Sequence, residues 1–461
     1  MPSINNSSET ICAPATGSGI GAIAVIRISG KDTYKIIDQI FSKQLSEVKP
    51  YTIHFGEIKD DKKVIDEVLI SVFKAPKSYT GEDTAEISCH GSEFIQKEIL
   101  NLLIKKGARL ANPGEFTLRA FLNGKLDLSQ AEAVADLIAS ESKSSHEIAI
   151  NKLKGDFSNE IKKLREQLIN FASLIELELD FSEEDVEFAN RDELIKLIEK
   201  IQVVILHLIS SFSFGNAIKK GVPVAIIGKP NAGKSTLLNV LLNEERAIVS
   251  DIAGTTRDAI EDTFVIDGIL FRFIDTAGIR ETTDSIESKG IEKTYEKTNS
   301  AQAIILMIDA TNSTAESIDK ELSELQLKVP HYKDKNIIVA INKCDEVEFD
   351  KNKLNHIPRV VFISAKKNEN IEELKHLLLE PIKNSTQQIG NLTISNVRHF
   401  EALQHTQEAL SRAIEGIKNE TSSDLIAMDI RQSLHFLGLI TGEISTDDLL
   451  ENIFSKFCIG K

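Results

Sequence analysis

Short apolar runs and long amphipathic stretches divide the chain into regions of different character. Up to about residue 122, β-branched runs alternate with Gly and Pro turns and one helical stretch, at 22–28, 64–72, 84–88 and 94–103. This region predicts an α+β domain. From about residue 128, apolar residues recur every three or four positions, over 161–179 and 194–208. That spacing predicts long amphipathic helices, with an acidic break at 180–185.

A third pattern begins after Gly215, where short apolar strands alternate with helices. The predicted strands lie at 222–227, 270–274, 303–308, 336–341 and 360–363. Such alternation predicts an α/β domain with a mostly parallel sheet. A helical pattern returns from about Val397 to the end of the chain. Since each helical half alone would leave an apolar stripe in water, we expect the two halves to pack together.

The sequence therefore predicts a multidomain α+β protein in which one domain is inserted in another. The expected divisions are an N-terminal domain at 1–122, a helical domain at 123–215 and 384–461, and an α/β domain at 216–383.

Composition excludes several classes of protein. The 461 residues carry a formal net charge of −16, which argues against a surface that is basic throughout and binds nucleic acid. The cysteines form no CxxC pair, so reduced thiols are expected rather than a disulfide framework or zinc site. No secretory signal is visible at the N-terminus. The uncharged stretch 201–218 is too polar for a membrane span, and we expect a buried helix end that runs into a linker.

Residues 228–235 read Gly-Lys-Pro-Asn-Ala-Gly-Lys-Ser and fit GxxxxGK[ST] between a predicted strand and a predicted helix. Glycines there let backbone N–H groups face phosphate oxygens, and the helix N-terminus adds positive potential. Lys234 would reach the terminal phosphates, and the Ser235 hydroxyl would bind Mg²⁺. The segment predicts a nucleotide-binding loop with contacts from Asn231, Ala232, Gly233, Lys234, Ser235 and Thr236.

Two further segments suit a bound triphosphate. Asp275-Thr276-Ala277-Gly278 ends a predicted strand, where a carboxylate can hold Mg²⁺ through water and the Gly278 N–H can contact the γ-phosphate. The segment before it supplies a hydroxyl, best Thr256, to complete the metal shell. That earlier segment reads Gly254-Thr255-Thr256-Arg257-Asp258 and lies between the nucleotide-binding loop and Asp275.

The base specificity is predicted by Asn342-Lys343-Cys344-Asp345, which follows another strand. A carboxylate at Asp345 can accept both the N1–H and the 2-amino group of guanine, whereas adenine would leave it unpaired. Ser364-Ala365-Lys366 follows the next strand and would supply a backbone N–H to guanine O6. The ordered motifs predict a GTP hydrolase that resembles the translation-factor-related GTPases.

The residue after the DTAG motif is Ile279, which cannot orient water as a Gln does there in many GTPases. Glu281, Asp284 and Glu287 are alternatives that geometry alone does not separate. Transition-state charge could be met by Arg257 or Arg280, or by a monovalent cation on the Asn231 amide oxygen.

Over essentially its full length the sequence resembles the tRNA-modifying GTPases of the MnmE (TrmE) family. The resemblance rests on the nucleotide-binding loop and on 27–30, 79–83, 113–116, 119–125, 254–258 and the terminal Cys458-Ile459-Gly460-Lys461. The last four residues are the most specific. The resemblance implies an N-terminal α/β folate-binding domain, a helical domain and an inserted Ras-like α/β P-loop G domain.

The resemblance also implies a cytoplasmic homodimer that is joined through the N-terminal domains and whose G domains dimerise with K⁺ and GTP. It implies a heterotetramer with the FAD-dependent MnmG (GidA) protein, with FAD on that partner only and no membrane. Together they would place a carboxymethylaminomethyl or aminomethyl group on C5 of the wobble uridine, position 34, of certain tRNAs. The one-carbon donor would be 5-formyl-tetrahydrofolate or a related folate.

Matching motifs assign the individual residues. GTP would also contact the segment Ser250, Asp251, Ile252, Ala253, Gly254, Thr255 and Thr256. Mg²⁺ would bind Ser235 and Thr256, and K⁺ would bind Asn231 and the backbones of Ser250, Ile252 and Thr255. Glu287 would orient the attacking water, and Cys458 would be a reactive thiol. Folate would bind Arg27, Glu86, Lys125 and Lys461. Glu86 suits this role because a pterin ring presents adjacent N–H and amino donors, as guanine does.

Other interpretations compete with these. The acidic segment 180–185 is more typical of a solvated loop than of a metal site. Cys89 beside His90 is more typical of a packed thiol than of a nucleophile. The main functional alternative is a ribosome-assembly GTPase that binds RNA, although no KH-like module is found after residue 384. The acidic total predicts that tRNA is held largely by the partner or by patches such as Lys162, Lys163 and Arg165.

Overall fold

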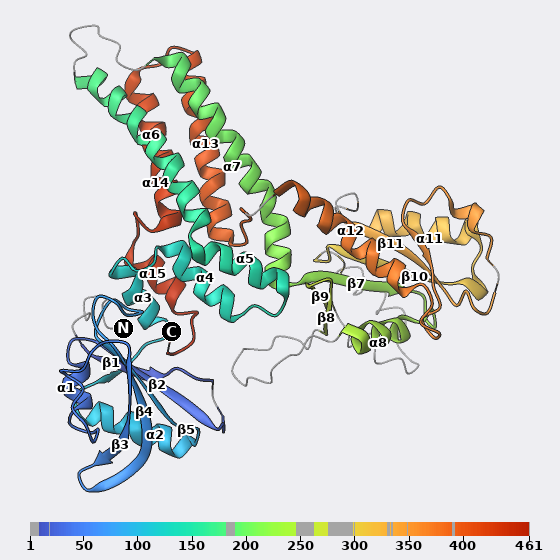
Figure 1. Ribbon diagram of the computed structural model, residues 1–461. Helices are drawn as coiled ribbons and strands as arrows, with labels where there is room; N and C mark the ends of the chain where they lie inside the picture. Colours follow the sequence, from blue (N-terminus) through green and yellow to red (C-terminus); the bar gives the residue numbers. More distant parts are fainter. Residues whose placement is uncertain are drawn as a thin grey trace.

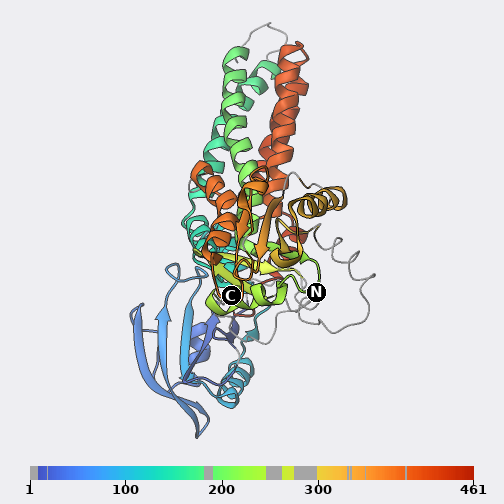
Figure 2. The same ribbon diagram turned by 90° about the vertical axis from the view of Figure 1, so that its right-hand side faces the viewer.

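The computed structural model describes residues 9–17, 19–180, 190–245, 262–274, 298, 300–329, 332, 335–347, 349–389 and 392–460. Figure 1 shows a sheet domain built from the first part of the chain, an elongated helical bundle, and a second sheet domain beside that bundle. The view turned by 90° shows the long helices of the bundle running side by side away from the first sheet domain (Figure 2).

The first domain is a six-stranded sheet in the order β3-β4-β5-β2-β1-β6. Alternate residues of its strands, such as Ile26, Ile70 and Ile87, are fully buried in one core with residues of α1 and α2. The other, open face carries both polar residues and exposed apolar residues. The elements are β1 Ile11–Pro14, β2 Ile23–Ser29, α1 Thr33–Ile37, β3 Thr52–Asp60, β4 Lys63–Phe73, β5 Thr84–His90, α2 Glu93–Lys105, β6 Arg109–Leu110 and α3 Glu115–Leu122.

The helical bundle joins two parts of the chain that are far apart in sequence. Its core contains Leu168, Ile198 and Ile205 from the first part, and Leu410 and Ile430 from the second. The predicted packing of the two helical halves is therefore confirmed. The helices are α4 Leu128–Ile138, α5 Lys143–Lys154, α6 Asp156–Asp180, α7 Arg191–Lys220, α13 Val397–Lys418, α14 Ser423–Thr441 and α15 Asp447–Phe454.

The prediction of a linker around Gly215 is wrong, because α7 continues to Lys220. A Cβ at Gly215 would lie 2.2 Å from the carbonyl oxygen of Ile394. The Ser211 hydroxyl accepts the Ile394 N–H at 3.1 Å, one turn earlier. Gly215 therefore marks a close crossing of the two helical halves rather than the end of a helix.

The second sheet has the order β12-β11-β10-β7-β9-β8, with every neighbouring pair parallel except β9 and β8. This confirms the mostly parallel sheet, while the antiparallel edge strand β8 was not predicted. Separate apolar cores cover its two faces. The elements are β7 Val222–Gly228, α8 Lys234–Glu245, β8 Thr263–Ile266, β9 Ile269–Phe273, β10 Ala303–Asp309, η2 Ala310–Asn312, α11 Ala315–Lys328, β11 Asn336–Asn342, η4 Lys351–Leu354, β12 Val360–Phe362 and α12 Ile371–Ile389.

We propose domain limits at 1–122, 123–215 with 384–461, and 216–383, although α7 and α12 each cross one of these limits. By length and composition alone, α7 also fits a membrane span, the one such helix among the described residues. Its Leu194, Ile201 and Leu208 nevertheless lie in the core of the bundle. Core helices of soluble proteins pass the same test, and the packing of α7 is that of a partly buried core helix.

Candidate functional site

The loop between β7 and α8 has a backbone that only particular residues allow. Gly228, Asn231 and Gly233 all have positive φ, at 149°, 62° and 96°. A Cβ at Gly228 would lie 2.3 Å from the Met307 carbonyl oxygen, and one at Gly233 would lie 2.2 Å from Asn342 Nδ2. Larger residues cannot replace these glycines without moving the loop. The loop is thus a built backbone cradle at a helix N-terminus, as a phosphate site requires.

Lys234, the first residue of α8, folds back over this loop. Its Nζ donates to the carbonyl oxygens of Gly228 and Lys229, each at 2.8 Å. Burial lowers the pKa of its ammonium group. Neutral carbonyl groups therefore hold the Lys234 ammonium group at the edge of the loop. A phosphate bound there would offset the loss of solvation that this charge has suffered on burial.

Asn342, at the end of β11, joins two of the predicted motifs. Its Nδ2 donates to the Ala232 carbonyl oxygen at 2.8 Å, and its Oδ1 accepts the Ala365 N–H at 2.9 Å. Because Asn342 is buried, these bonds fix the positions of the phosphate loop and the 364–366 segment relative to each other. The motifs predicted from separate strand ends thus meet at one edge of the sheet.

The predicted base-recognising carboxylate lies next to this junction. A hydrogen bond from Ser364, aided by the nearby Lys367, lowers the pKa of Asp345. An ionised carboxylate is what acceptance of two donors from guanine demands. The neighbouring Lys343 is held by Asp309 at the end of β10, with Nζ to Oδ2 at 2.6 Å. The role of Asp309 was not predicted from the sequence, although an acidic residue at the end of a strand beside the site could have indicated it.

The remaining predicted nucleotide and metal residues lie outside the described residues. They are Ser250, Asp251, Ile252, Ala253, Gly254, Thr255, Thr256, Asp275, Thr276, Ala277, Gly278 and Glu287, together with the alternatives Arg257, Arg280, Glu281 and Asp284. Of the predicted metal ligands, the described ranges contain Asn231 and Ser235. In those ranges no group of three or more His, Cys, Asp or Glu side chains could hold a metal ion.

A second candidate site lies on the open face of the N-terminal sheet. Arg27 on β2 and Glu86 on β5 are direct cross-strand partners. Arg27 Nε and Nη2 both donate to Glu86 Oε1, at 3.0 and 2.7 Å. The guanidinium also lies 5.3 Å from the ring centre of Tyr79 and 5.6 Å from that of Phe116. Two predicted folate residues thus meet, and the two rings, whose roles were not predicted, lie against Arg27.

The other predicted folate residues differ in how far the structure describes them. Lys125 follows α3 and lies beside the 79–83 loop, where a Cβ built on Gly81 would be 3.4 Å from its Cε. Lys461 lies outside the described residues. Beneath the loop, buried Arg119 donates to Glu82 at 3.1 Å and to Glu115 at 2.9 Å. This network, which was not predicted from the sequence, fixes the loop to α3.

The cysteines fall into distinct environments. Cys458 is exposed, and its carbonyl oxygen accepts the Gly114 N–H at 3.4 Å at the start of α3. The C-terminal segment therefore returns to the N-terminal domain of the same chain, as Figure 1 also shows. Cys89 is buried, which raises the pKa of its thiol to about 11. Its neighbour His90 is exposed and bonds Asp66 through Nδ1 at 2.7 Å. A Cys89–His90 nucleophile is thereby excluded.

The proposed basic patch on α6 is not a free cationic surface. Lys162 lies 3.5 Å from Asp127 and Lys163 lies 4.0 Å from Glu160. Arg165 pairs with Glu443 and donates from Nε to the Leu434 carbonyl oxygen at 3.3 Å. Exposed ion pairs of this kind contribute little, so the role of this patch in holding tRNA stays a prediction.

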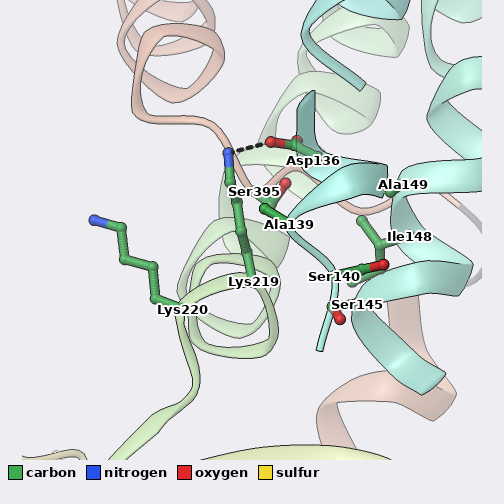
Figure 3. Close-up of a pocket in the computed structure, with 9 residues that line it drawn as sticks. All are labelled: Asp136, Ala139, Ser140, Ser145, Ile148, Ala149, Lys219, Lys220 and Ser395. Carbon is green, nitrogen blue, oxygen red and sulfur yellow. Dashed lines mark ion pairs between the residues drawn. The ribbon is translucent and has the colours of Figure 1, made fainter. Parts of the chain in front are cut away.

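A cavity of about 120 Å³ lies apart from both candidate sites, between α4, α5 and the end of α7. Figure 3 shows Lys219 reaching Asp136, with Nζ to Oδ1 at 2.7 Å, while Lys220 points away. None of the predicted site residues lines this cavity. The Lys219–Asp136 pair fixes the end of α7, which leads directly into β7, to α4.

A phosphate loop and two base-recognition motifs at one edge of a mainly parallel sheet define a nucleotide-binding domain of the GTPase class. Residues 10–125 match the family described as GTP-binding protein TrmE N-terminus, and residues 128–458 match MnmE helical domain. The chain belongs to this MnmE (TrmE) family.

Named relatives match over nearly their full lengths. The tRNA modification GTPase MnmE of Cytophaga hutchinsonii is 55% identical over 461 residues, covering 99% of each chain. The MnmE proteins of Christiangramia forsetii and Bacteroides thetaiotaomicron are 53% and 52% identical, each match covering 98% of this chain and 99% of the relative.

Proposed function

We propose that this chain is a K⁺-dependent GTPase that modifies C5 of the wobble uridine of certain tRNAs together with an FAD-containing partner of the MnmG type. One observation carries the proposal. A phosphate loop that Asn342 joins to the proposed base-recognising segment, and the Arg27–Glu86 pair with the C-terminal segment docked beside it, occur in one chain of this family. The chain thus combines a nucleotide-driven domain with a separate site for one-carbon chemistry.

In the nucleotide site, the backbone loop between Gly228 and Gly233 fits a phosphate because it leads into the N-terminus of α8 and its glycines pack directly against Met307 and Asn342, where no side chain is tolerated. Ser235 and Thr256 would hold Mg²⁺, and Asn231 with the backbones of Ser250, Ile252 and Thr255 would hold K⁺. The bound ions would supply positive charge where the transition state becomes negative. Lys234 binds the terminal phosphates, Asp345 selects guanine, and Glu287 orients the water.

In the one-carbon site, Glu86 has an oxygen available for a pterin. Both Arg27 bonds go to Oε1, and among the described residues no hydrogen bond reaches Oε2. A reduced folate would bind at Arg27, Glu86, Lys125 and Lys461, and 5-formyl-tetrahydrofolate is the proposed form. Cys458 lies on the segment that is docked beside Arg27, where a thiol can act on the one-carbon unit or the uridine.

The open face of the N-terminal sheet also suggests how two copies join. Phe55 and Leu69 are cross-strand partners on β3 and β4, and they are 56% and 46% exposed. Ile53, on the same face of β3, is 66% exposed. An apolar sheet face of this kind supports a homodimer formed through the N-terminal domains. We place the protein in the cytoplasm, with the FAD-dependent MnmG protein as its partner and tRNA as its substrate.

The proposal predicts that GTP hydrolysis is fast in KCl and slow in NaCl at equal ionic strength. Asn231→Ala should remove most of that difference, because the amide oxygen contributes to holding the cation. Asn355→Ala, at an exposed position of the same domain, is the matched control and should behave as the wild type. Equal turnover of the wild type in both salts would contradict K⁺ dependence.

A further inference from the structure

The segment after α15 is fastened on both sides of Cys458. Before it, Phe457 packs in a cluster with Leu128 and Phe454. At the cysteine itself, the carbonyl oxygen accepts the Gly114 N–H at 3.4 Å. Beyond it, the Gly460 carbonyl oxygen accepts Arg27 Nη1 at 3.3 Å. The exposed thiol is therefore carried on a backbone held at two points.

Gly460 is suited to this close docking and few other residues would be. Its φ is +96°, and a Cβ there would lie 2.0 Å from the Pro14 carbonyl oxygen of β1. A side chain at this position would push the segment off the sheet and take the carbonyl group away from Arg27. The hydrogen bond between Arg27 and the Gly460 carbonyl group thus requires a residue without a side chain at position 460.

Arg27 divides its donors between two partners. Nε and Nη2 point to Glu86 Oε1, and Nη1 points to Gly460. The side chain is mostly buried between Tyr79 and Phe116. Because the guanidinium is planar and rigid, it cannot turn away from one partner and keep its geometry with the other.

A pterin bound at Glu86 would compete for one of these partners. Its adjacent N–H and amino donors require both carboxylate oxygens, as in bidentate recognition of guanine. Oε1 already accepts two bonds from Arg27, so it must lose at least one of them when a second ligand donates to it. The resulting turn of the guanidinium also disturbs Nη1, and with it the bond to Gly460.

We propose that Arg27 is a positioning residue that holds Cys458 in place through Gly460, and that a reduced pterin bound at Glu86 releases this hold. The inference rests on the proposed folate function and adds its regulation. In the empty site the C-terminal segment is docked. In the occupied site the Gly460 carbonyl group leaves Arg27 and the segment stays tied to the ligand through Lys461 alone, so its thiol can move to the one-carbon unit or to the uridine.

Hydrogen exchange of the backbone amides of 455–460, measured by mass spectrometry on the full-length protein, tests the hold without any ligand. Arg27→Gln should speed exchange of this segment at least about threefold, since one charged hydrogen bond is lost. Arg412→Gln, which removes an exposed arginine on α13, is the matched control and should leave the segment unchanged. Wild-type exchange of the segment in Arg27→Gln would overturn the proposal.

A second pair of variants reaches the same contact from the other side, in case Arg27→Gln disturbs the sheet. Gly460→Ala should also speed exchange of 455–460, because the added Cβ displaces the carbonyl group. Gly107→Ala carries the same backbone strain, with φ +108°, but meets nothing within 4 Å and is the control. Unchanged exchange in Gly460→Ala would also contradict the hold.

Addition of 5-formyl-tetrahydrofolate tests the release. Saturating ligand should bring the exchange of 455–460 in the wild type close to that of Arg27→Gln. Slower or unchanged exchange, with binding confirmed by calorimetry, would overturn release while the proposed folate site stands. Absence of calorimetric binding would instead contradict the folate site, and the ligand-free variants would still decide whether Arg27 holds the segment.

Discussion

The side-chain amide of Asn342 donates to the backbone carbonyl oxygen of Ala232 at 2.8 Å, across 110 residues of sequence. The same side chain accepts the N–H of Ala365 at 2.9 Å. One buried residue therefore sets the distance between the phosphate loop and the base-recognising segment, although it is not itself expected to touch the phosphates.

Asn342→Ala should weaken GTP binding by about tenfold or more, because the loop loses the donor that orders it and Ala365 loses its acceptor. Fluorescent GTP titration measures this. Asn336→Ala, at the opposite end of β11, removes bonds to Leu377 and Arg359 and is the matched control for a lost asparagine. Similar losses of affinity in both variants would mean that β11 is merely destabilised.

Asp345→Asn should lower GTP affinity by about 100-fold and improve binding of xanthosine triphosphate. The amide can donate to the oxygen that xanthine carries at position 2, whereas guanine presents an amino donor there. Competition binding with both nucleotides checks the exchange of specificity. If the Asp345→Asn variant still prefers GTP, Asp345 has no part in base recognition.

Glu287→Ala should abolish most GTP hydrolysis and leave GTP affinity nearly unchanged, since a water-orienting carboxylate acts on the transition state. Single-turnover hydrolysis and equilibrium binding separate the two effects. Glu281→Ala and Asp284→Ala are the comparisons. If Glu287→Ala hydrolyses GTP at the normal rate and Glu281→Ala or Asp284→Ala does not, the water is oriented by Glu281 or Asp284 instead.

His399 predicts a pH-dependent stability of the helical bundle. Burial lowers its pKa from 6.5 to about 3, and Lys152 adds to this effect. Burial would raise the pKa of Glu132, but His399, whose Nε2 lies 2.8 Å away, and then Arg398 and Lys152 hold it well below its usual range. The folded state thus keeps His399 neutral while the unfolded chain binds a proton below pH 6.5. Stability from this group is present above pH 6.5 and is lost as the pH falls toward 3.

Between pH 7 and pH 5 the loss from His399 should reach about 2 kcal/mol of unfolding free energy. Thermal or denaturant unfolding at both pH values measures it. His399→Gln should flatten the dependence, whereas His405→Gln, at a partly exposed ring, should not. Identical slopes in the wild type and His399→Gln would show that the buried imidazole is not the source.

The elements with strong local patterns could be predicted from the sequence. The strands that became β7, β10 and β11 are continuous apolar runs bounded by polar or glycine residues, as parallel strands with two covered faces require. The phosphate loop followed from its own spacing. The short strands β1 and β6 carry too few residues for a clear period, and β8 alternates over only four.

The errors arose where contacts join distant segments. Gly215 resembles a helix end until Ile394 is seen against it. The basic patch at Lys162, Lys163 and Arg165 stays a prediction, although Asp127 and Glu443 lie beside two of its cations. The contact between Arg27 and Gly460 spans 433 residues. No local pattern carries such information, because it depends on how separate elements pack.

Analysis of wobble-uridine nucleosides in tRNA tests the central proposal most directly, in cells that carry only the wild-type protein, only Cys458→Ser, or no copy. We predict that C5-modified wobble uridine is lost without the protein and with Cys458→Ser, while purified Cys458→Ser retains K⁺-dependent GTP hydrolysis. Normal modification with Cys458→Ser would leave the thiol without a catalytic role. An unchanged nucleoside profile in cells without the protein would contradict the proposed function itself and favour a role in ribosome assembly.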